Sequence, residues 1–364
     1  MAQHEGEPPM DDPLELEHMM GFDGTSRGSV QYHPTDTTVM ISYTGCLVVI
    51  SDVTDPHQQE FMRGHNEAIT CLAVSPSGAM IASGQASTTR VPNSEAMIIV
   101  WDYQTRQAVY RLMELHDGIA FSRNRVQQVS FSPDDLFLAG SDDQPGGAKL
   151  CVWHTTTGQL ATLANTKQQY ASFLTWGEVT ASTKKINKSD SSYKLHAAVR
   201  SQVIQYNLSM DVRSMQYQFE TARMQLPSSG LDREYHCAAM VKPLQTGVWE
   251  LLAGSSAGEL CIFNVETKVF RACVPVSKGG VLSLAVREAG ADFEEGTAPL
   301  VYCGCGDGTL KLLQGHDLQW TCLQETYLEG MVRSLTISAD GAELLAGTSE
   351  GNIYRLDASS LVSE

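Results

Sequence analysis

A repeated segment of β-type sequence runs through this chain of 364 residues and limits what it can fold into. In each copy an apolar run ends in small residues and a glycine, a short polar turn follows, and alternating apolar residues return. The clearest copies are residues 251–263 (LLAGSSAGELCIF), 301–312 (VYCGCGDGTLKL) and 344–356 (LLAGTSEGNIYRL). Each copy predicts two antiparallel strands joined by a tight turn in which a glycine adopts a positive φ.

A second shared segment precedes several of these copies. It is an alternating strand followed by a turn of Pro, Asp or Gly, as in residues 69–78 (ITCLAVSPSG), 126–135 (VQQVSFSPDD) and 332–341 (VRSLTISADG). Proline presets φ for a turn, and aspartate and glycine tolerate the turn conformations that follow it. Sustained helical periodicity is missing from the sequence, so we expect a nearly all-β chain.

Two dipeptides identify the repeat. Gly64-His65 opens one unit and Trp101-Asp102 ends its third strand, while Trp153-His154 holds the corresponding place in the next unit. This order and spacing resemble the WD40 repeat, which is one four-stranded blade of a propeller. We therefore predict a seven-bladed WD40-type β-propeller over residues 14–360. The predicted blades are about 28–62, 64–113, 115–163, 167–223, 235–274, 279–328 and 329–360.

The ends of the chain and three insertions lie outside the regular repeat. The seventh blade lacks a final strand, and the alternating residues 14–20 (LELEHMM) are expected to supply it and close the ring. Residues 1–13 are expected to be a disordered acidic leader and 361–364 a tail. Insertions at 85–96, 182–194 and 288–299 are expected on rim loops, where binding residues concentrate.

Charge and composition exclude several classes of partner. The chain has 25 Lys and Arg against 42 Asp and Glu, a net charge of −17. Nucleic-acid backbones and anionic membranes should repel it, so we expect neither as a partner. The sequence shows no signal peptide, no transit peptide and no apolar stretch long enough to span a bilayer. With nine scattered cysteines, it is typical of a reduced intracellular protein.

Several segments resemble one family in more detail than the generic repeat. Residues 64–78, 81–85 (IASGQ) and 98–103 (IIVWDY) resemble the second blade of the cilia- and flagella-associated protein 52 family. Residues 14–24 and 347–355 resemble the boundaries of that family's first propeller. The resemblance covers nearly the whole chain from residue 14 and is weakest in the fourth blade. That family has two propellers, and this chain is expected to correspond to the first. Centriolar-wall WD-repeat proteins and echinoderm microtubule-associated proteins are the nearest rivals.

The resemblance implies a function that composition alone does not. It implies a non-catalytic scaffold at the inner junction of ciliary doublet microtubules, located in the axoneme of the cilium or flagellum. The resemblance to centriolar-wall WD-repeat proteins would instead imply a location in the centriole or basal body. The implied partners are tubulin and other junction proteins, including the parkin co-regulated protein. The alternative is a generic cytosolic WD40 adaptor that binds peptide motifs of partner proteins.

Three residues of the second blade are candidates for a buried hydrogen-bond network. By resemblance to other WD40 blades, His65, Ser83 and Trp101 are expected to lock the strands rather than to catalyse a reaction. The aspartate usual in the turn is displaced by the insertion at 85–96, so we expect the network to be incomplete.

Four lysines form the densest basic run of this acidic chain. Lys184, Lys185, Lys188 and Lys194 fall in the insertion of the fourth blade. Because microtubule surfaces are strongly acidic, these lysines are candidate partner-binding residues. The alternative is an ordinary solvated loop.

Motifs that suggest chemistry have simpler structural explanations. Cys303 and Cys305 are two residues apart, so in a strand their side chains would lie on the same face. No further metal-ligand motif lies near them in sequence. Residues 304–308 are glycine-rich without the spacing of a phosphate-binding loop. Residues 182–185 match S-x-x-K but lack the companion motifs of that enzyme class. We therefore expect neither an enzyme nor a protein with a metal or cofactor.

Overall fold

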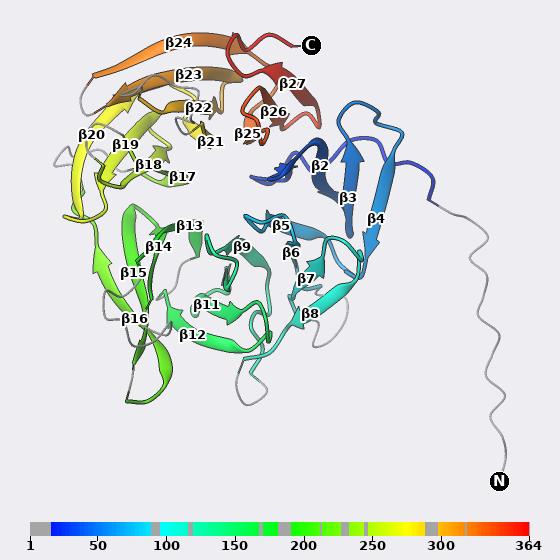
Figure 1. The fold of residues 1–364 in the computed structure, drawn as a ribbon, viewed down its shortest axis with the longest axis vertical. Helices are drawn as coiled ribbons and strands as arrows, with labels where there is room; N and C mark the ends of the chain where they lie inside the picture. Colours follow the sequence, from blue (N-terminus) through cyan, green and yellow to red (C-terminus); the bar gives the residue numbers. More distant parts are fainter. Residues whose placement is uncertain are drawn as a thin grey trace.

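Seven antiparallel sheets surround a central axis in this protein (Figure 1). The structure is a computed structural model and describes residues 16–88, 95–115, 119–166, 170–180, 191–211, 213–226, 233–243, 247–287, 298–316 and 319–363. Six sheets have four strands and the last has three, each sheet in sequence order from the inner to the outer strand. The predicted seven-bladed β-propeller is therefore confirmed.

The strands follow the repeat along the chain. Blade one contains β1 (Val30–His33), β2 (Asp36–Thr44), β3 (Leu47–Asp52) and β4 (Gln59–Arg63), and blade two contains β5 (Ile69–Val74), β6 (Met80–Gln85), β7 (Ile98–Asp102) and β8 (Ala108–Leu112). Blade three contains β9 (Val126–Phe131), β10 (Phe137–Asp142), β11 (Lys149–His154) and β12 (Leu160–Asn165). Blade four contains β13 (Ala171–Thr180), β14 (Ser192–Val199), β15 (Gln202–Asp211) and β16 (Gln216–Arg223). Blade five contains β17 (Tyr235–Val241), β18 (Glu250–Ser255), β19 (Glu259–Asn264) and β20 (Val269–Pro275). Blade six contains β21 (Val281–Arg287), β22 (Leu300–Cys305), β23 (Thr309–His316) and β24 (Gln319–Tyr327). Blade seven contains β25 (Val332–Ile337), β26 (Glu343–Thr348) and β27 (Ile353–Asp357).

The hydrophobic core is divided among the seams between blades. Seven clusters of buried residues each combine side chains from two neighbouring blades. Second strands such as β10, β18 and β22 are buried along their whole length, because a neighbouring blade packs on both of their faces. This explains why the repeat has near-continuous apolar runs rather than strict alternation.

The glycine that recurs in the repeat lies where the next blade approaches most closely. A β-carbon there would lie 2.6 to 2.9 Å from side-chain carbons of the first valine of the next inner strand, as at Gly84 against Val126, Gly254 against Val281 and Gly304 against Val332. A side chain at these positions would push the blades apart. The small residue therefore sets the spacing of the ring.

Hydroxyl groups of the inner strands tie the same seams together. Thr70 Oγ1 donates to the carbonyl of Val126 at 2.6 Å, and Ser283 Oγ donates to the carbonyl of Val332 at 2.9 Å. Each acceptor is the first residue of the next inner strand. These bonds link the inner strand of one blade directly to the backbone of the next.

The ring closes where the seventh blade meets the first, beside each other in Figure 1. The backbone amide of Ser29 donates to Ser334 Oγ at 2.9 Å, and a β-carbon at Gly347 would lie 2.9 Å from the ring of Phe22. Phe22 thus occupies the place that a valine takes at other seams. Among the described residues this seam has the smallest core, with four buried side chains.

The prediction that residues 14–20 form the fourth strand of the seventh blade is not what the structure has. Residues 16–20 form no strand and lie against the first blade. There the amide of Met19 donates to Gln59 Oε1 at 2.8 Å and its carbonyl accepts from Gln59 Nε2 at 2.9 Å. The side-chain amide of Gln59 satisfies the backbone groups that a strand partner would have taken. Residues 14 and 15 lie outside the described residues.

The expected leader and tail have different outcomes. Residues 1–13 lie outside the described part of the chain. The expected tail packs on the seventh blade: Leu361 is buried, and Ser363 makes an isolated bridge with Leu356 of β27. Burial of Leu361 explains why the chain turns back on the blade.

The antiparallel order places the three insertions on two faces. We define face one as the end that carries the connections from first to second and from third to fourth strands, and face two as the opposite end. The strand ends that flank the β13–β14 and β21–β22 connections lie on face one, whereas residues 182–190 and 288–297 of the two insertions lie outside the described residues. The β6–β7 connection belongs to face two, and its described ends pair with residues before β9 through Ala86–Arg125 and Ala96–Ser122 bridges. None of the described residues forms a helix of the length and apolarity that a bilayer crossing requires.

The closing seam gives a first prediction. Replacing Phe22, which is 8% exposed, by alanine should lower the free energy of unfolding by about 3 kcal/mol, because it empties the smallest core of the ring. Chemical denaturation measures the change. The control Met20→Ala, at a side chain that is 88% exposed, should change stability by less than about 0.5 kcal/mol. Equal effects of the two substitutions would contradict the role given to Phe22.

Candidate functional sites

The structure brings His65, Ser83 and Trp101 together inside the second blade. Trp101 Nε1 donates to Ser83 Oγ at 2.8 Å, and Ser83 Oγ lies 2.6 Å from His65 Nε2. All three side chains are buried, and a β-carbon at Gly64 would lie 2.8 Å from the Trp101 ring. In the Gly64-His65 pair, the glycine lets the backbone approach the ring of Trp101, and the histidine places a buried imidazole next to Ser83.

Gln85 completes this network, which the sequence analysis expected to be incomplete. Gln85 Oε1 lies 2.7 Å from His65 Nδ1, and Gln85 Nε2 donates to Asn66 Oδ1 at 2.7 Å. Gln85 was assigned to the insertion, but it is the last residue of β6 and its side chain is fully buried. In the sequence, the signal for the role of Gln85 is a polar residue directly after the mostly apolar and small residues 80–84.

The hydrogen bonds fit a neutral imidazole at His65. An amide oxygen can only accept, so His65 Nδ1 donates to Gln85 Oε1, and in the neutral ring Nε2 accepts from the hydroxyl of Ser83. Burial agrees with this assignment, because it lowers the pKa of His65 to about 4. A neutral, buried histidine whose two ring nitrogens are both hydrogen-bonded can hold the β4–β5 connection against β6, but it is not available to a substrate.

The lysine cluster is described only at its end. Lys184, Lys185 and Lys188 lie outside the described residues. Lys194 is part of β14, where it pairs in register with Asn207 and is partly exposed. The end of the expected insertion is thus regular strand, and the strand ends that flank residues 181–190 lie on face one.

The cysteines singled out in the sequence are buried in the sheet. Cys303 and Cys305 of β22 are both 0% exposed, and burial raises the pKa of Cys305 to about 12. A neutral buried thiol is neither a nucleophile nor a ready metal ligand.

Another group of side chains carries three potential metal ligands. Glu259, Cys261 and Cys273 have their ligand atoms within 4.8 Å of one another. The Glu259 carboxylate is already paired with Arg233 at 2.6 Å. The two sulfur atoms are 2.8 Å apart, whereas thiolates on one tetrahedral zinc would be separated by about 3.7 Å. These residues therefore do not fit a preformed zinc centre.

The inner strands line a central channel with a cavity of about 330 Å³. Arg27 and Arg333 at this cavity donate to the carbonyls of His236 and Thr25, so both guanidinium groups bind backbone. Burial lowers the pKa of His236 to about 4 and raises that of the neighbouring Cys237 to about 12. The neutral imidazole and neutral thiol provide no activated nucleophile in the described lining.

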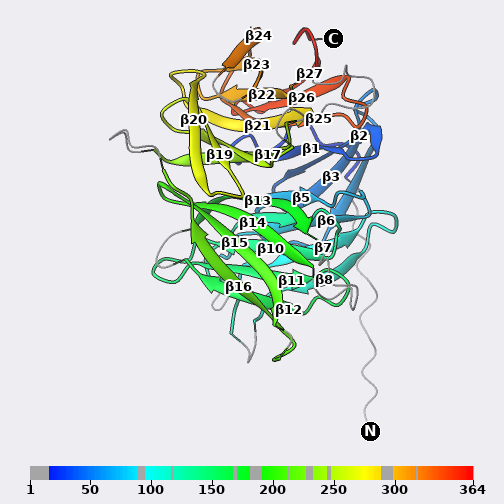
Figure 2. The same cartoon turned by 60° about the vertical axis from the view of Figure 1, so that its left-hand side comes forward.

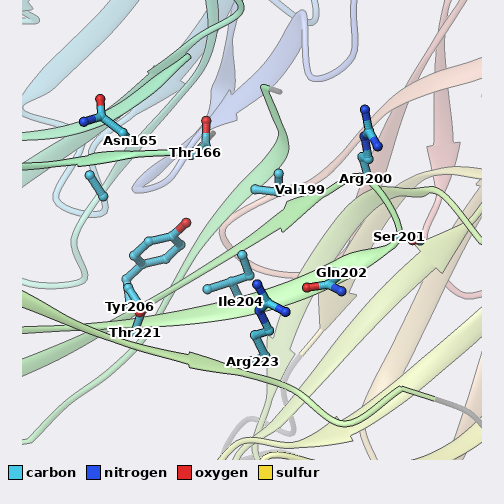
Figure 3. Close-up of a pocket in the computed structure, with 11 residues that line it drawn as sticks. Asn165, Thr166, Val199, Arg200, Ser201, Gln202, Ile204, Tyr206, Thr221 and Arg223 are labelled. Carbon is cyan, nitrogen blue, oxygen red and sulfur yellow. The ribbon is translucent and has the colours of Figure 1, made fainter. Parts of the chain in front are cut away.

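A larger cavity of about 580 Å³ lies on face two between the third and fourth blades (Figure 3). It is lined by the end of β12, the β14–β15 turn and the end of β16, with Arg200 and Arg223 among its residues. The outer strands β12 and β16 lie side by side here (Figure 2). The sequence does not indicate this groove, because its two arginines are separated by 22 residues and come to one groove only through the register of β15 and β16.

Comparison with known proteins supports the repeat and the family resemblance. The family model "WD domain, G-beta repeat" matches residues 57–102. Cilia- and flagella-associated protein 52 of Chlamydomonas reinhardtii is 28% identical over 358 residues, covering 98% of this chain and 51% of that protein. The human protein of the same name is 26% identical over 348 residues, covering 94% and 49%. The chain thus spans about half the length of these curated relatives, and the resemblance indicated by its motifs is confirmed.

Two further similarities concern a rival family and the fold. Centriole proteome protein 16 of Chlamydomonas reinhardtii is 25% identical over 189 residues, covering 44% of this chain and 8% of that protein. The solved structure titled "Structure of U3-55K" superposes with a TM-score of 0.61 at 16% identity, covering 89% of this chain and 88% of that one. At that identity the structural likeness supports the propeller fold alone.

The buried histidine gives a prediction on pH. The folded-state pKa of His65, about 4, lies below the 6.5 of an ordinary histidine, so protonation favours the unfolded chain. Its contribution to stability is complete above about pH 6.5 and is lost as the pH falls toward 4. Between these values the wild type should lose up to about 1.4 kcal/mol per pH unit more than His65→Gln.

Urea denaturation of both proteins between about pH 7 and pH 4.5 measures this difference. The control His57→Gln, at an exposed histidine, should keep the pH dependence of the wild type. Parallel curves for wild type and His65→Gln would show that His65 is not held neutral by the fold.

Proposed function

We propose that this chain is a non-catalytic scaffold propeller of cilia or flagella. In this proposal it sits at the inner junction of doublet microtubules and binds tubulin and junction proteins such as the parkin co-regulated protein. The observation that carries the proposal is sequence similarity over 94–98% of the chain to proteins named cilia- and flagella-associated protein 52. The match to Centriole proteome protein 16 supports the centriole or basal body as the second location.

A scaffold role agrees with how this chain uses its reactive side chains. His65 is buried and hydrogen-bonded to Ser83, Cys303 and Cys305 are buried, and the arginines of the channel are bound to carbonyl groups. The two faces of the ring carry its loops, which leaves them as the surfaces for partners.

The net charge of −17 restricts where an acidic microtubule could touch the chain. In this proposal the contact is made by Lys184, Lys185 and Lys188, with Lys194 beside them. The strands that flank the first three lysines end on face one, so the proposal assigns that face to the microtubule. Local positive charge there would offset the repulsion from the rest of the surface.

Charge reversal tests this assignment. The variant Lys184→Glu/Lys185→Glu/Lys188→Glu should weaken co-sedimentation with microtubules about tenfold at low salt, and the difference should shrink at about 0.5 M salt. The control Arg123→Glu/Lys278→Glu reverses two exposed charges on face two and should bind within about twofold of the wild type. If the triple variant binds as tightly as the wild type across the salt series, these lysines are not the contact.

The alternative function is a generic cytosolic adaptor that binds peptide motifs of partner proteins. The groove between the third and fourth blades favours it, because exposed arginines line a cavity large enough for side chains. A peptide array that recovers linear motifs, from a chain that does not co-sediment with microtubules, would support this alternative.

A further inference from the structure

One side of the fourth blade supplies most of the lining of the groove on face two. Gln202, Ile204 and Tyr206 alternate along β15, so their side chains lie on the same face of the sheet. In the register of β16, Arg223 lies opposite Ile204 and Thr221 opposite Tyr206. Figure 3 shows the side chains of Ile204, Gln202 and Arg223 close together, as this register requires.

The two guanidinium groups of the groove are exposed and unpaired. In the part of the chain that the structure describes, neither Arg200 nor Arg223 donates a side-chain hydrogen bond or forms an ion pair, and both side chains are exposed. The described lining contains no carboxylate. On a chain with 42 acidic residues and a net charge of −17, a groove with two arginines and no acid is a local reversal of charge.

The hydroxyl of Tyr206, a largely buried side chain that lines the groove, is a second, independent feature. Tyr206 is 3% exposed and lines the cavity, and its hydroxyl has no hydrogen-bond partner among the described residues. Burial raises its pKa to about 12, so the phenol keeps its proton at neutral pH and can donate it. Because this hydroxyl has no acceptor among the described residues, it can donate to an acceptor that enters the cavity.

We propose that this groove is the docking site for an extended acidic segment of a partner protein. Carboxylates of that segment pair with Arg200 and Arg223, the Tyr206 hydroxyl donates to a carboxylate or carbonyl oxygen, and an apolar side chain covers Ile204. Arginine suits this role because its planar guanidinium binds carboxylate with two parallel hydrogen bonds. The site is on the opposite face from the lysine cluster, so it does not rest on the proposed microtubule contact.

The occupant is assigned to a partner rather than to a nucleic acid or to the acidic leader. A nucleic-acid backbone would place many phosphates against a surface of net charge −17, whereas a short peptide brings charge only to the groove. The leader carries Glu5, Glu7, Asp11 and Asp12. It enters the described structure at residue 16 on the first blade, whereas the groove joins the third and fourth blades.

Fluorescence anisotropy with the full chain tests the proposal. The probe is a labelled peptide with the core Glu-Glu-Leu-Glu-Glu, and its control has Gln in place of each Glu. The acidic peptide should bind about tenfold more tightly than the control at low salt, because each bound carboxylate adds a charge-assisted hydrogen bond. Equal binding of the two peptides would overturn the proposal.

Three variants place the binding in the groove. Arg200→Asn/Arg223→Gln should weaken binding of the acidic peptide about tenfold, and Tyr206→Phe about threefold. Asparagine suits position 200, where φ is +57°. The matched control Arg213→Gln removes an exposed arginine at the opposite end of the same blade and should bind within about twofold of the wild type. If the double variant binds as the wild type does, or Arg213→Gln loses as much affinity, the groove is not the site.

Two further measurements distinguish the remaining outcomes. The thermal midpoint of the double variant should match that of the wild type, because neither arginine has a partner to lose among the described residues. Glu5→Gln/Glu7→Gln/Asp11→Asn/Asp12→Asn should leave the peptide affinity within about twofold. A rise of about tenfold in that variant would assign the groove to the chain's own leader and overturn the partner proposal.

Discussion

Close approach of neighbouring blades at a repeated glycine is the constraint on which the rest of the structure depends. Where Gly304 meets Val332, a β-carbon would collide with the next blade, and beside it Ser283 donates to the Val332 carbonyl at 2.9 Å. The same pairing of a glycine contact and a hydroxyl bond occurs between blades two and three, at Gly84 and Thr70. At the last seam Phe22 takes the place of the valine, so a residue ahead of the first blade completes the circle.

Ring closure decides which side chains remain for function. Second strands are buried on both faces, and polar side chains within them, such as Ser83 and Gln85, make internal hydrogen bonds. Partner binding is left to the two faces and to the outer ends of the blades. The groove beside Tyr206 lies at such an end, where β12 and β16 come together and polar groups remain without partners in the described chain.

The sequence predicts the repeat well and its exceptions poorly, for physical reasons. The glycine and turn residues of each copy are local signals, so the seven blades and the His65–Ser83–Trp101 positions could be read directly. Alternation in residues 14–20 is compatible with a strand but does not say which backbone will pair with it, and the Gln59 amide takes that role for Met19. Arg200 and Arg223 could not be linked in advance, because only the register of β15 and β16 brings them to one groove.

The central claim is that this propeller is a scaffold of ciliary microtubules, and its location in a ciliated cell tests that claim most directly. The full chain with a small fluorescent tag, expressed at its natural level, should follow the doublet microtubules along the axoneme and stay there after detergent removes the membrane and soluble proteins. A tagged chain that is diffuse in the cytoplasm, and is absent from axonemes, centrioles and basal bodies after extraction, would contradict the account.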